Sequence, residues 1–217
     1  CEDCGITFKI LETDLYGDYI EKFGVRRVAS IPFWSVDANG KKGKMRRQCT
    51  IDKKIVAIQK YVRYEILGYK FRQKCKKEDK GRHEMHIGFS KEEEHRVFES
   101  MNPMFVTKFP LVDMGLTRAD NYKYILEEWG IETKASACSY CPFHRNYFFQ
   151  HIKEHCPDCY KAVVNLDNVL EERQPGSQIR SKLYISRSRK RIADLTPEEC
   201  MDAETFLYRG KPIWNGF

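Results

Sequence analysis

The stretch M-H-I-G-F-S-K-E-E-E-H-R at Met85–Arg96 sets the first expectation for the fold. Its apolar first half is typical of a short buried strand, and Gly88 marks a tight turn directly after it. Ser90 followed three residues later by Glu93 matches a capping box, which predicts that a helix begins here. A strand that leads straight into a helix is the repeating step of an α/β protein.

The same alternation continues along the chain in both directions. Apolar residues recur at helical spacing from Ile55 to Ile66, and Gly68 follows as the expected helix stop. In an α/β sheet, ligands bind at the carboxyl ends of strands, so the loops near residues 87–90 and 46–49 are candidate sites. We expect helices over residues 51–67, 117–129 and 143–154, a helix that begins at residue 90, and another that runs from after Cys159 to residue 173; Gly130 ends the helix over 117–129. We expect strands over residues 6–11, 85–90 and 105–112.

Composition and charge limit the class of protein. The 217 residues carry a net charge of +7 and nine cysteines. The cations gather at residues 41–47, 70–80 and 180–191, which favours either an anionic partner or a solvated basic surface. No apolar run is long enough to span a bilayer, and the first residues do not resemble a signal peptide. We therefore expect a cytoplasmic protein without a membrane partner, whose paired cysteines bind metal or act in redox chemistry.

The segment S-A-C-S-Y-C-P-F-H at Ser136–His144 carries the sharpest chemical signal. Two thiolates two residues apart, Cys138 and Cys141, can bind one metal ion, and His144 follows three residues later. The alternative is a pair of buried free cysteines.

A second pair, Cys156 and Cys159, completes a spacing that is typical of a four-cysteine zinc site. A straight helix over 143–154 would separate the two pairs by about 18 Å, however, because each helical residue rises 1.5 Å. Ligands of one zinc ion must lie within about 2.3 Å of it. We therefore predict that the two pairs have different roles.

The segment M-R-R-Q-C-T at Met45–Thr50 predicts an anion site. Arg46 and Arg47 precede a helix start, where unpaired N–H groups and guanidinium groups together favour phosphate or sulfate. Lys54 and Arg96 are further candidates for anion binding, Arg96 because it lies one turn into the helix after Gly88. The alternative is an ordinary basic turn with a half-buried cysteine, Cys49.

Four segments together resemble the PAPS-reductase-like proteins of the PP-loop (adenine nucleotide α-hydrolase-like) superfamily. The resemblance covers roughly residues 6–173, and four motifs in one order are far more specific than any single one. The segments are R-R-Q-C-T at Arg46–Thr50, I-G-F-S-K-E-E-E-H-R at Ile87–Arg96, F-P-L-V-D-M-G-L-T-R at Phe109–Arg118 and the Ser136–His144 segment.

The resemblance implies a Rossmann-like (HUP-type) sheet with flanking helices and a bound ATP or sulfonucleotide. It also implies a metal site, because the segment after Cys49 resembles one that helps to hold a [4Fe–4S] cluster in sulfonucleotide reductases. The doubled cysteine of that segment is absent here, so Cys49, Cys138 and Cys141 remain as thiolate ligands. His144 would complete a Cys₃His zinc site, or a cluster would keep an open iron.

Two departures from the family pattern concern catalysis. The phosphate loop S-G-G-x-D-S is missing, no Gly-Gly occurs in the chain, and we expect the strand that carries this loop to precede Cys1. The C-terminal catalytic cysteine motif E-C-G-I-H is also absent, so we assign no catalytic residue and do not identify the chain as a PAPS reductase.

Two functions therefore follow as hypotheses. The first is an enzyme over residues 1–173 that binds an adenine nucleotide or sulfonucleotide and acts in adenylation, sulfur transfer or nucleotide modification, with a nucleic acid as a further partner. The second is an inactive, metal-stabilised module that binds nucleic acid or protein. In both, residues 174–217 form a basic extension with few core positions, in which Lys190 and Arg191 are expected to be solvated.

Overall fold

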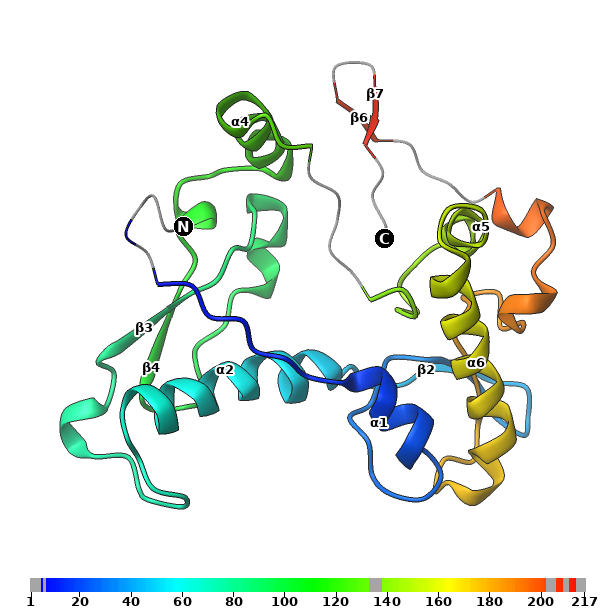
Figure 1. Ribbon diagram of the computed structural model, residues 1–217, viewed down its shortest axis with the longest axis horizontal. Coiled ribbons are helices and arrows are strands. Elements are labelled where there is room, and N and C mark those ends of the chain that lie inside the picture. The colour runs from blue at the N-terminus through cyan, green and yellow to red at the C-terminus, as the bar shows by residue number, and fades with distance from the viewer. Residues whose placement is uncertain (1–4, 6, 133–137, 202–205, 209–210, 214–217) are drawn as a thin grey trace. The chain divides into compact units, whose positions relative to one another are not determined.

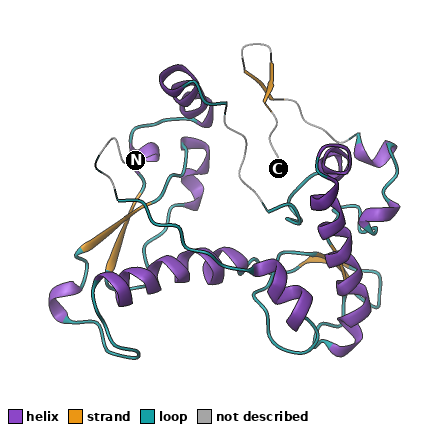
Figure 2. Cartoon of the chain, viewed as in Figure 1, coloured by secondary structure: helices purple, strands orange, loops and turns teal. Residues whose placement is uncertain are grey.

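The computed structural model describes residues 5, 7–132, 138–201, 206–208 and 211–213, and it has a mixed α/β architecture. The chain divides into two compact units (Figures 1 and 2). Unit 1 consists of residues 1–68, 135–206 and 214–217, and unit 2 consists of residues 69–134 and 207–213. The strands β6 (Phe206–Tyr208) and β7 (Lys211–Ile213) pair with each other.

Unit 1 combines helices with a small antiparallel sheet. The strands β1 (Trp34–Val36), β2 (Lys42–Lys44) and β5 (Lys182–Tyr184) lie in the order β2-β1-β5. The register places Trp34 opposite Lys44 on one side and Tyr184 on the other. Its helices are α1 (Leu15–Lys22), the continuous segment η2 (Ile51–Ile55), α2 (Val56–Tyr61) and η3 (Val62–Ile66), then α5 (Asn146–His155), α6 (Pro157–Arg173) and the short 3₁₀ turns η6 (Gln174–Gly176), η7 (Ile192–Asp194) and η8 (Glu198–Cys200).

The core of unit 1 is formed where α1, α5 and α6 pack together with the sheet. α6 contacts α5, α1 and β5, and α5 meets it at its upper end in Figure 1. Burial of large apolar side chains is the main favourable term in folding, at roughly 1.5–3 kcal/mol for each fully buried residue. The core includes Tyr19, Phe33, Phe149, Val163, Leu166, Leu170, Leu183, Ile185 and Ile192.

Part of the C-terminal segment belongs to this core. Leu183 and Ile185 are completely buried, and Ile192 is nearly so. Arg191 pairs with the buried carboxylate of Asp167 at 3.0 Å, and its side chain is only 15% exposed. The expectation that Arg191 is a solvated charge was therefore wrong, because its guanidinium group neutralises a buried acid.

Unit 2 contains a parallel pair of strands, β3 (His83–His86) and β4 (Phe105–Lys108), with His83 opposite Phe105. Its helices are η4 (Lys77–Asp79), η5 (Lys91–Arg96), α3 (Pro110–Asp113) and α4 (Arg118–Trp129). The described strands form sheets of three, two and two members, and a Rossmann-like sheet is not evident among them. No helix in the described ranges is both long and apolar enough to cross a bilayer.

The helices were predicted better than the strands. The helical segment that begins at Cys49 is confirmed, and Gly68 follows it with φ +64°. α4 is also confirmed, with a capping box between Thr117 and Asp120 and a left-handed Gly130 at its end. The helices predicted around 143–154 and up to residue 173 correspond to α5 and α6.

Four local predictions were wrong. Over the described part of the first predicted strand, residues 7–11 are irregular and leave Phe8 and Ile10 exposed. β3 ends at His86, so residues 87–90 are not strand. A short 3₁₀ helix follows Ser90, whose side chain makes no capping bond to the backbone. β4 is likewise shorter than predicted, because Pro110 begins α3.

Candidate functional site

The Cys138–Cys141 segment in unit 1 forms two consecutive tight turns. The Cys141 N–H donates to the Cys138 carbonyl at 2.9 Å, and the His144 N–H donates to the Cys141 carbonyl at 3.1 Å. The indole N–H of Trp34 donates to the Pro142 carbonyl at 2.9 Å, which ties the turns to β1. The sequence therefore presents the two thiols from a compact loop that is fixed to the sheet.

Cys49 shares the electrostatic surroundings of these thiols. It begins the helical segment before η2, and its N–H donates to the Ser30 carbonyl at 3.0 Å. Burial raises the pKa of the Cys141 thiol, and Cys138 and Cys49 raise it further by charge repulsion. The N–H of Phe143 and the charge of Arg47 act in the opposite direction. Arg47, two residues before Cys49, also lies 5.4 Å from the ring centre of Phe143, which links the Cys49 segment to the thiol turn.

The arrangement has the soft donors that zinc or an iron–sulfur cluster prefers. In the described ranges, however, no group of three or more His, Cys, Asp or Glu side chains is placed to hold a metal ion. The three thiols would therefore have to move closer together to bind one.

His144 is held by contacts other than those of a metal ligand. It is almost fully buried, and its ring stacks on Phe148 at a centroid distance of 3.6 Å. Its Nε2 lies 2.9 Å from the Cys138 carbonyl oxygen. Nε2 of His144 is thus engaged with the thiol turn and helps to fix it.

Two tyrosines border the thiols. Burial raises the pKa of Tyr140, and the charge of Cys138 and a hydrogen bond to it raise the pKa further. Burial also raises the pKa of Tyr19 to about 12, although the Ile31 N–H donates to its hydroxyl oxygen. Both phenols remain protonated at neutral pH and can act as hydrogen-bond donors beside the thiols.

Cations and aromatic rings meet at the edge of this thiol loop, and we call this set the cation–aromatic rim. The Lys44 ammonium lies 4.7 Å from the ring centre of Phe143 and 5.4 Å from that of Trp34. The Arg47 guanidinium lies 5.4 Å from the Phe143 ring, and that of Arg189 lies 5.2 Å from the Trp34 ring. Such contacts contribute roughly 0.5–1 kcal/mol each at exposed sites. The rim places positive charge and aromatic surface side by side.

The cations of the rim differ in their hydrogen bonding and in their exposure to solvent. Arg189 has a left-handed backbone (φ +58°), and it donates to the carbonyls of Ser35 and Gly43 at 3.4 Å each. Arg189 therefore joins β1 to β2. Lys44 and Arg47 are exposed, so their charges face solvent and are accessible to an anion.

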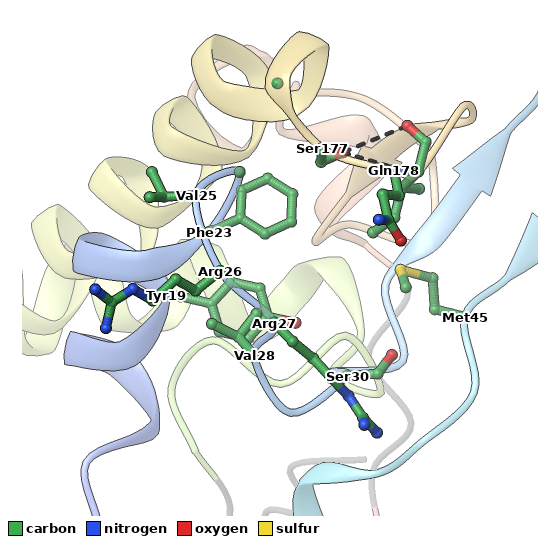
Figure 3. A pocket seen from close by; sticks show the side chains of 13 residues that line it. Tyr19, Phe23, Val25, Arg26, Arg27, Val28, Ser30, Met45, Ser177 and Gln178 are labelled. Carbon is green, nitrogen blue, oxygen red and sulfur yellow. Dashed lines mark hydrogen bonds between the residues drawn. The ribbon is translucent and has the colours of Figure 1, made fainter.

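A separate cavity of about 350 Å³ in unit 1 carries two more arginines (Figure 3). Its wall combines aromatic and aliphatic side chains with polar groups of the turn at residues 176–179. The lining residues are Tyr19, Phe23, Gly24, Val25, Arg26, Arg27, Val28, Ser30, Met45, Gly176, Ser177, Gln178 and Ile179. A cavity with an apolar wall and exposed arginines is a second candidate for a small anionic ligand.

The predicted anion residues are distributed over both units. Arg46 and Lys54 are exposed in unit 1, and Arg47 lies in the rim. Arg96 belongs to unit 2, where it pairs with Glu93 and lies over the Phe89 ring at 4.4 Å. The sequence analysis missed Trp34, Lys44, Phe143, Arg189, Arg26 and Arg27, although Lys44 lay within a basic cluster that had been noted.

Cys156 and Cys159 are bonded to each other as a disulfide. The ten-residue helix α5 separates them in sequence from the Cys138–Cys141 loop, as predicted. The two pairs thus have different bonding, since Cys138 and Cys141 are free thiols.

Comparison with family models, with curated proteins and with solved structures finds no match to this chain.

Proposed function

We propose that the chain is a cytoplasmic enzyme domain of the PAPS-reductase-like class that binds an adenine nucleotide or a sulfonucleotide beside a thiolate metal site. One observation carries the proposal: the guanidinium group of Arg47, two residues before Cys49, lies 5.4 Å from the ring centre of Phe143, two residues after Cys141. Two of the four motifs of the resemblance, Arg46–Thr50 and Ser136–His144, contain these residues. The proposal includes a Rossmann-like sheet, of which the parallel pair β3–β4 would be one part.

The ligand follows from the chemistry of the rim. A nucleotide has phosphate or sulfate groups and an aromatic base. Lys44 and Arg47 offer positive charge, and Arg47 can form two parallel hydrogen bonds to an anion. Trp34 and Phe143 offer aromatic surface for stacking at the same place. A ligand that combines both properties fits the rim better than a simple anion does.

The thiols define the second half of the proposal. Cys49, Cys138 and Cys141 would hold zinc or a [4Fe–4S] cluster, either with His144 as a fourth ligand or with an open position. Such a group would supply Lewis-acid or redox chemistry when bound. The protein's own contribution is to hold the anion with Arg47 near the thiols, where sulfur transfer to a nucleotide or to a nucleic acid would take place.

Nucleotide titrations of matched variants test the anion site. Arg47→Ala should weaken the binding of adenine nucleotides or sulfonucleotides by about ten-fold to a hundred-fold, because a hydrogen bond to a charged group is worth roughly 1.5–3 kcal/mol. Lys161→Ala removes a side chain that is 77% exposed and paired only with exposed Asp158, so it should leave the affinity unchanged. Equal affinities in wild type and Arg47→Ala would contradict the rim. A loss confined to Arg27→Ala would move the ligand to the cavity of Figure 3.

Metal analysis tests the thiol site independently. Protein purified without oxygen should contain zinc, or iron with sulfide, and Cys141→Ser should lose it. Cys75→Ser is the matched control, since Cys75 is a half-buried free thiol of unit 2. Well-folded protein that contains no metal would contradict the proposal.

A metal-stabilised nucleic-acid-binding module is the second candidate function, and the exposed β2 favours it. All three residues of β2, two of them lysines, are exposed next to the rim. Phosphate backbones bind such surfaces with an affinity that falls as salt rises. Binding of single-stranded RNA or DNA that Lys44→Ala weakens, without any nucleotide binding, would make this the better assignment.

A further inference from the structure

The disulfide links Cys156, the single residue between α5 and α6, to Cys159 in the first turn of α6. The two Cα atoms are 5.3 Å apart, a usual separation for bonded cysteines. The Cys156 N–H donates to the Ile152 carbonyl at 2.9 Å, and the Cys156 carbonyl accepts from the Tyr160 N–H at 3.0 Å. Cys156 is therefore fixed at once to the last turn of α5 and to the first turn of α6.

The two sulfur-bearing residues differ in their surroundings. Cys159 is half-buried and packs against the hydrophobic core of unit 1. Cys156 is also half-buried, but it is not among the residues that pack against this core. The core thus supports Cys159, and Cys156 lacks this support. This asymmetry is what a thiol exchange site needs, since one sulfur must be attacked and the other must stay in place.

A purely structural role fits the pair poorly. A disulfide stabilises a fold mainly by closing a long loop, and this one closes a loop of only two intervening residues. α5 and α6 already pack against each other without it. In a cytoplasmic chain, moreover, C-x-x-C pairs that form disulfides are usually transient and catalytic.

We propose that Cys156 and Cys159 form a thiol–disulfide exchange site that takes electrons from a dithiol reductant and passes them to an accessible disulfide. A thiolate of the reductant attacks Cys156 Sγ, the bond to Cys159 breaks, and Cys159 leaves as a thiolate. The second thiolate of the reductant then attacks its own sulfur in the mixed disulfide and releases Cys156. The reductant ends as a disulfide, and the pair carries two electrons as two thiols. The reverse sequence reduces a second disulfide.

The wild-type chain supplies the first test. The full-length protein is equilibrated with mixtures of reduced and oxidised dithiothreitol and trapped with iodoacetamide. Trypsin releases both cysteines in one peptide, Glu154–Lys161. We expect this peptide to change from no label to two labels in one step as the mixture becomes reducing, while the Cys75 peptide is labelled throughout. Two labels in every mixture, or labels that appear only after a chelator is added, would overturn the proposal.

Variants supply the second test, with circular dichroism to show that they are folded. Cys159→Ser exposed to glutathione disulfide should form a mixed disulfide at Cys156 about ten-fold faster than Cys156→Ser forms one at Cys159. Wild type and Cys75→Ser should both accelerate the reduction of insulin by dithiothreitol, and Cys156→Ser should not. If Cys156→Ser matches wild type in this assay, the pair is not an exchange site.

Discussion

Replacing Asp167 by alanine would leave Arg191 without its main carboxylate partner inside unit 1. Asp167 is 1% exposed. Its Oδ1 lies 3.0 Å from Arg191 Nη1, and its Oδ2 accepts from the Ile192 N–H at 2.8 Å. The substitution therefore removes an ion pair and a backbone hydrogen bond from a buried environment.

The size of the effect follows from what Arg191 would keep. Removing one partner of a buried ion pair costs roughly 3–5 kcal/mol. Arg191 would still donate to the Leu183 carbonyl at 3.2 Å and lie 3.4 Å from the exposed carboxylate of Glu171. We therefore expect the low end of the range, about 3 kcal/mol. For a protein of this length that is a fall in melting temperature of roughly 6–12 °C.

The pKa of Asp167 predicts a compensating double substitution. Burial raises this pKa, and the hydrogen bonds from Ile192 and Arg191, with the charge of Arg191, offset only part of the rise. Because the pKa of Asp167 is higher in the folded protein than its unfolded value of 3.8, Asp167 contributes to the free energy of unfolding below pH 3.8. This contribution is lost as the pH rises through the folded pKa. At neutral pH the ionised pair therefore costs free energy, so Asp167→Leu combined with Arg191→Leu should recover most of the loss.

Urea unfolding followed by circular dichroism at neutral pH checks these expectations. Arg187→Ala is the control, because Arg187 is an exposed arginine of the same segment and should change stability by less than about 0.5 kcal/mol. The reasoning is refuted if Asp167→Ala and Arg187→Ala have the same unfolding midpoint, or if the double variant is less stable than Asp167→Ala.

Four further predictions concern stability and the thiol site. Hydrogen bonds to Lys22 and Lys53 lower the pKa of Asp18, so its contribution is present above pH 3.8 and lost as pH falls through the lower folded value; Asp18→Asn should flatten the acid limb of a stability–pH profile. Gly24→Ala should destabilise unit 1 by more than about 1 kcal/mol in urea, because φ is +82° and the new Cβ would lie 2.7 Å from the Arg173 carbonyl oxygen; Gly40→Ala, at φ +78° in open space, should cost less. Thr117→Ala should weaken α4 by about 1 kcal/mol, measured by amide exchange across residues 118–129. His144→Gln separates the two forms of the proposed metal site: metal retained as in Cys75→Ser indicates three thiolates with an open position, and metal lost as in Cys141→Ser identifies His144 as the fourth ligand.

Local signals account for the part of the fold that the sequence predicted. The capping residues Thr117 and Asp120 and the stop Gly130 act within α4 itself, so its limits follow from nearby residues alone. The first predicted strand failed because a strand also needs a partner, and Phe8 and Ile10 remain exposed. For the same reason the pairing of β1 with β5 was not foreseen, since Ser35 and Leu183 lie far apart in sequence.

The parts of the candidate site that depend on the spacing of residues in the sequence were predicted. The parts that depend on contacts between distant residues were missed. The spacing of Cys138 and Cys141 is visible in the sequence, and so is the arginine pair before Cys49. The rim depends on the hydrogen bond from Trp34 to Pro142, which joins residues 108 positions apart. The C-terminal segment was predicted to have few core positions because its buried residues Leu183, Ile185 and Ile192 are isolated among cationic residues. A count of charges over the segment therefore does not reveal them.

α5 physically connects the two cysteine sites of unit 1. Its N-terminal end follows the thiol turn, which His144 fixes by stacking on Phe148 and by bonding to the Cys138 carbonyl. Its C-terminal end is Cys156, where the disulfide closes onto α6. Phe149 and Ile152 bury the helix in the core between these ends, and ten residues span about 15 Å. A rigid helix at this length keeps the pairs too far apart to share one metal ion.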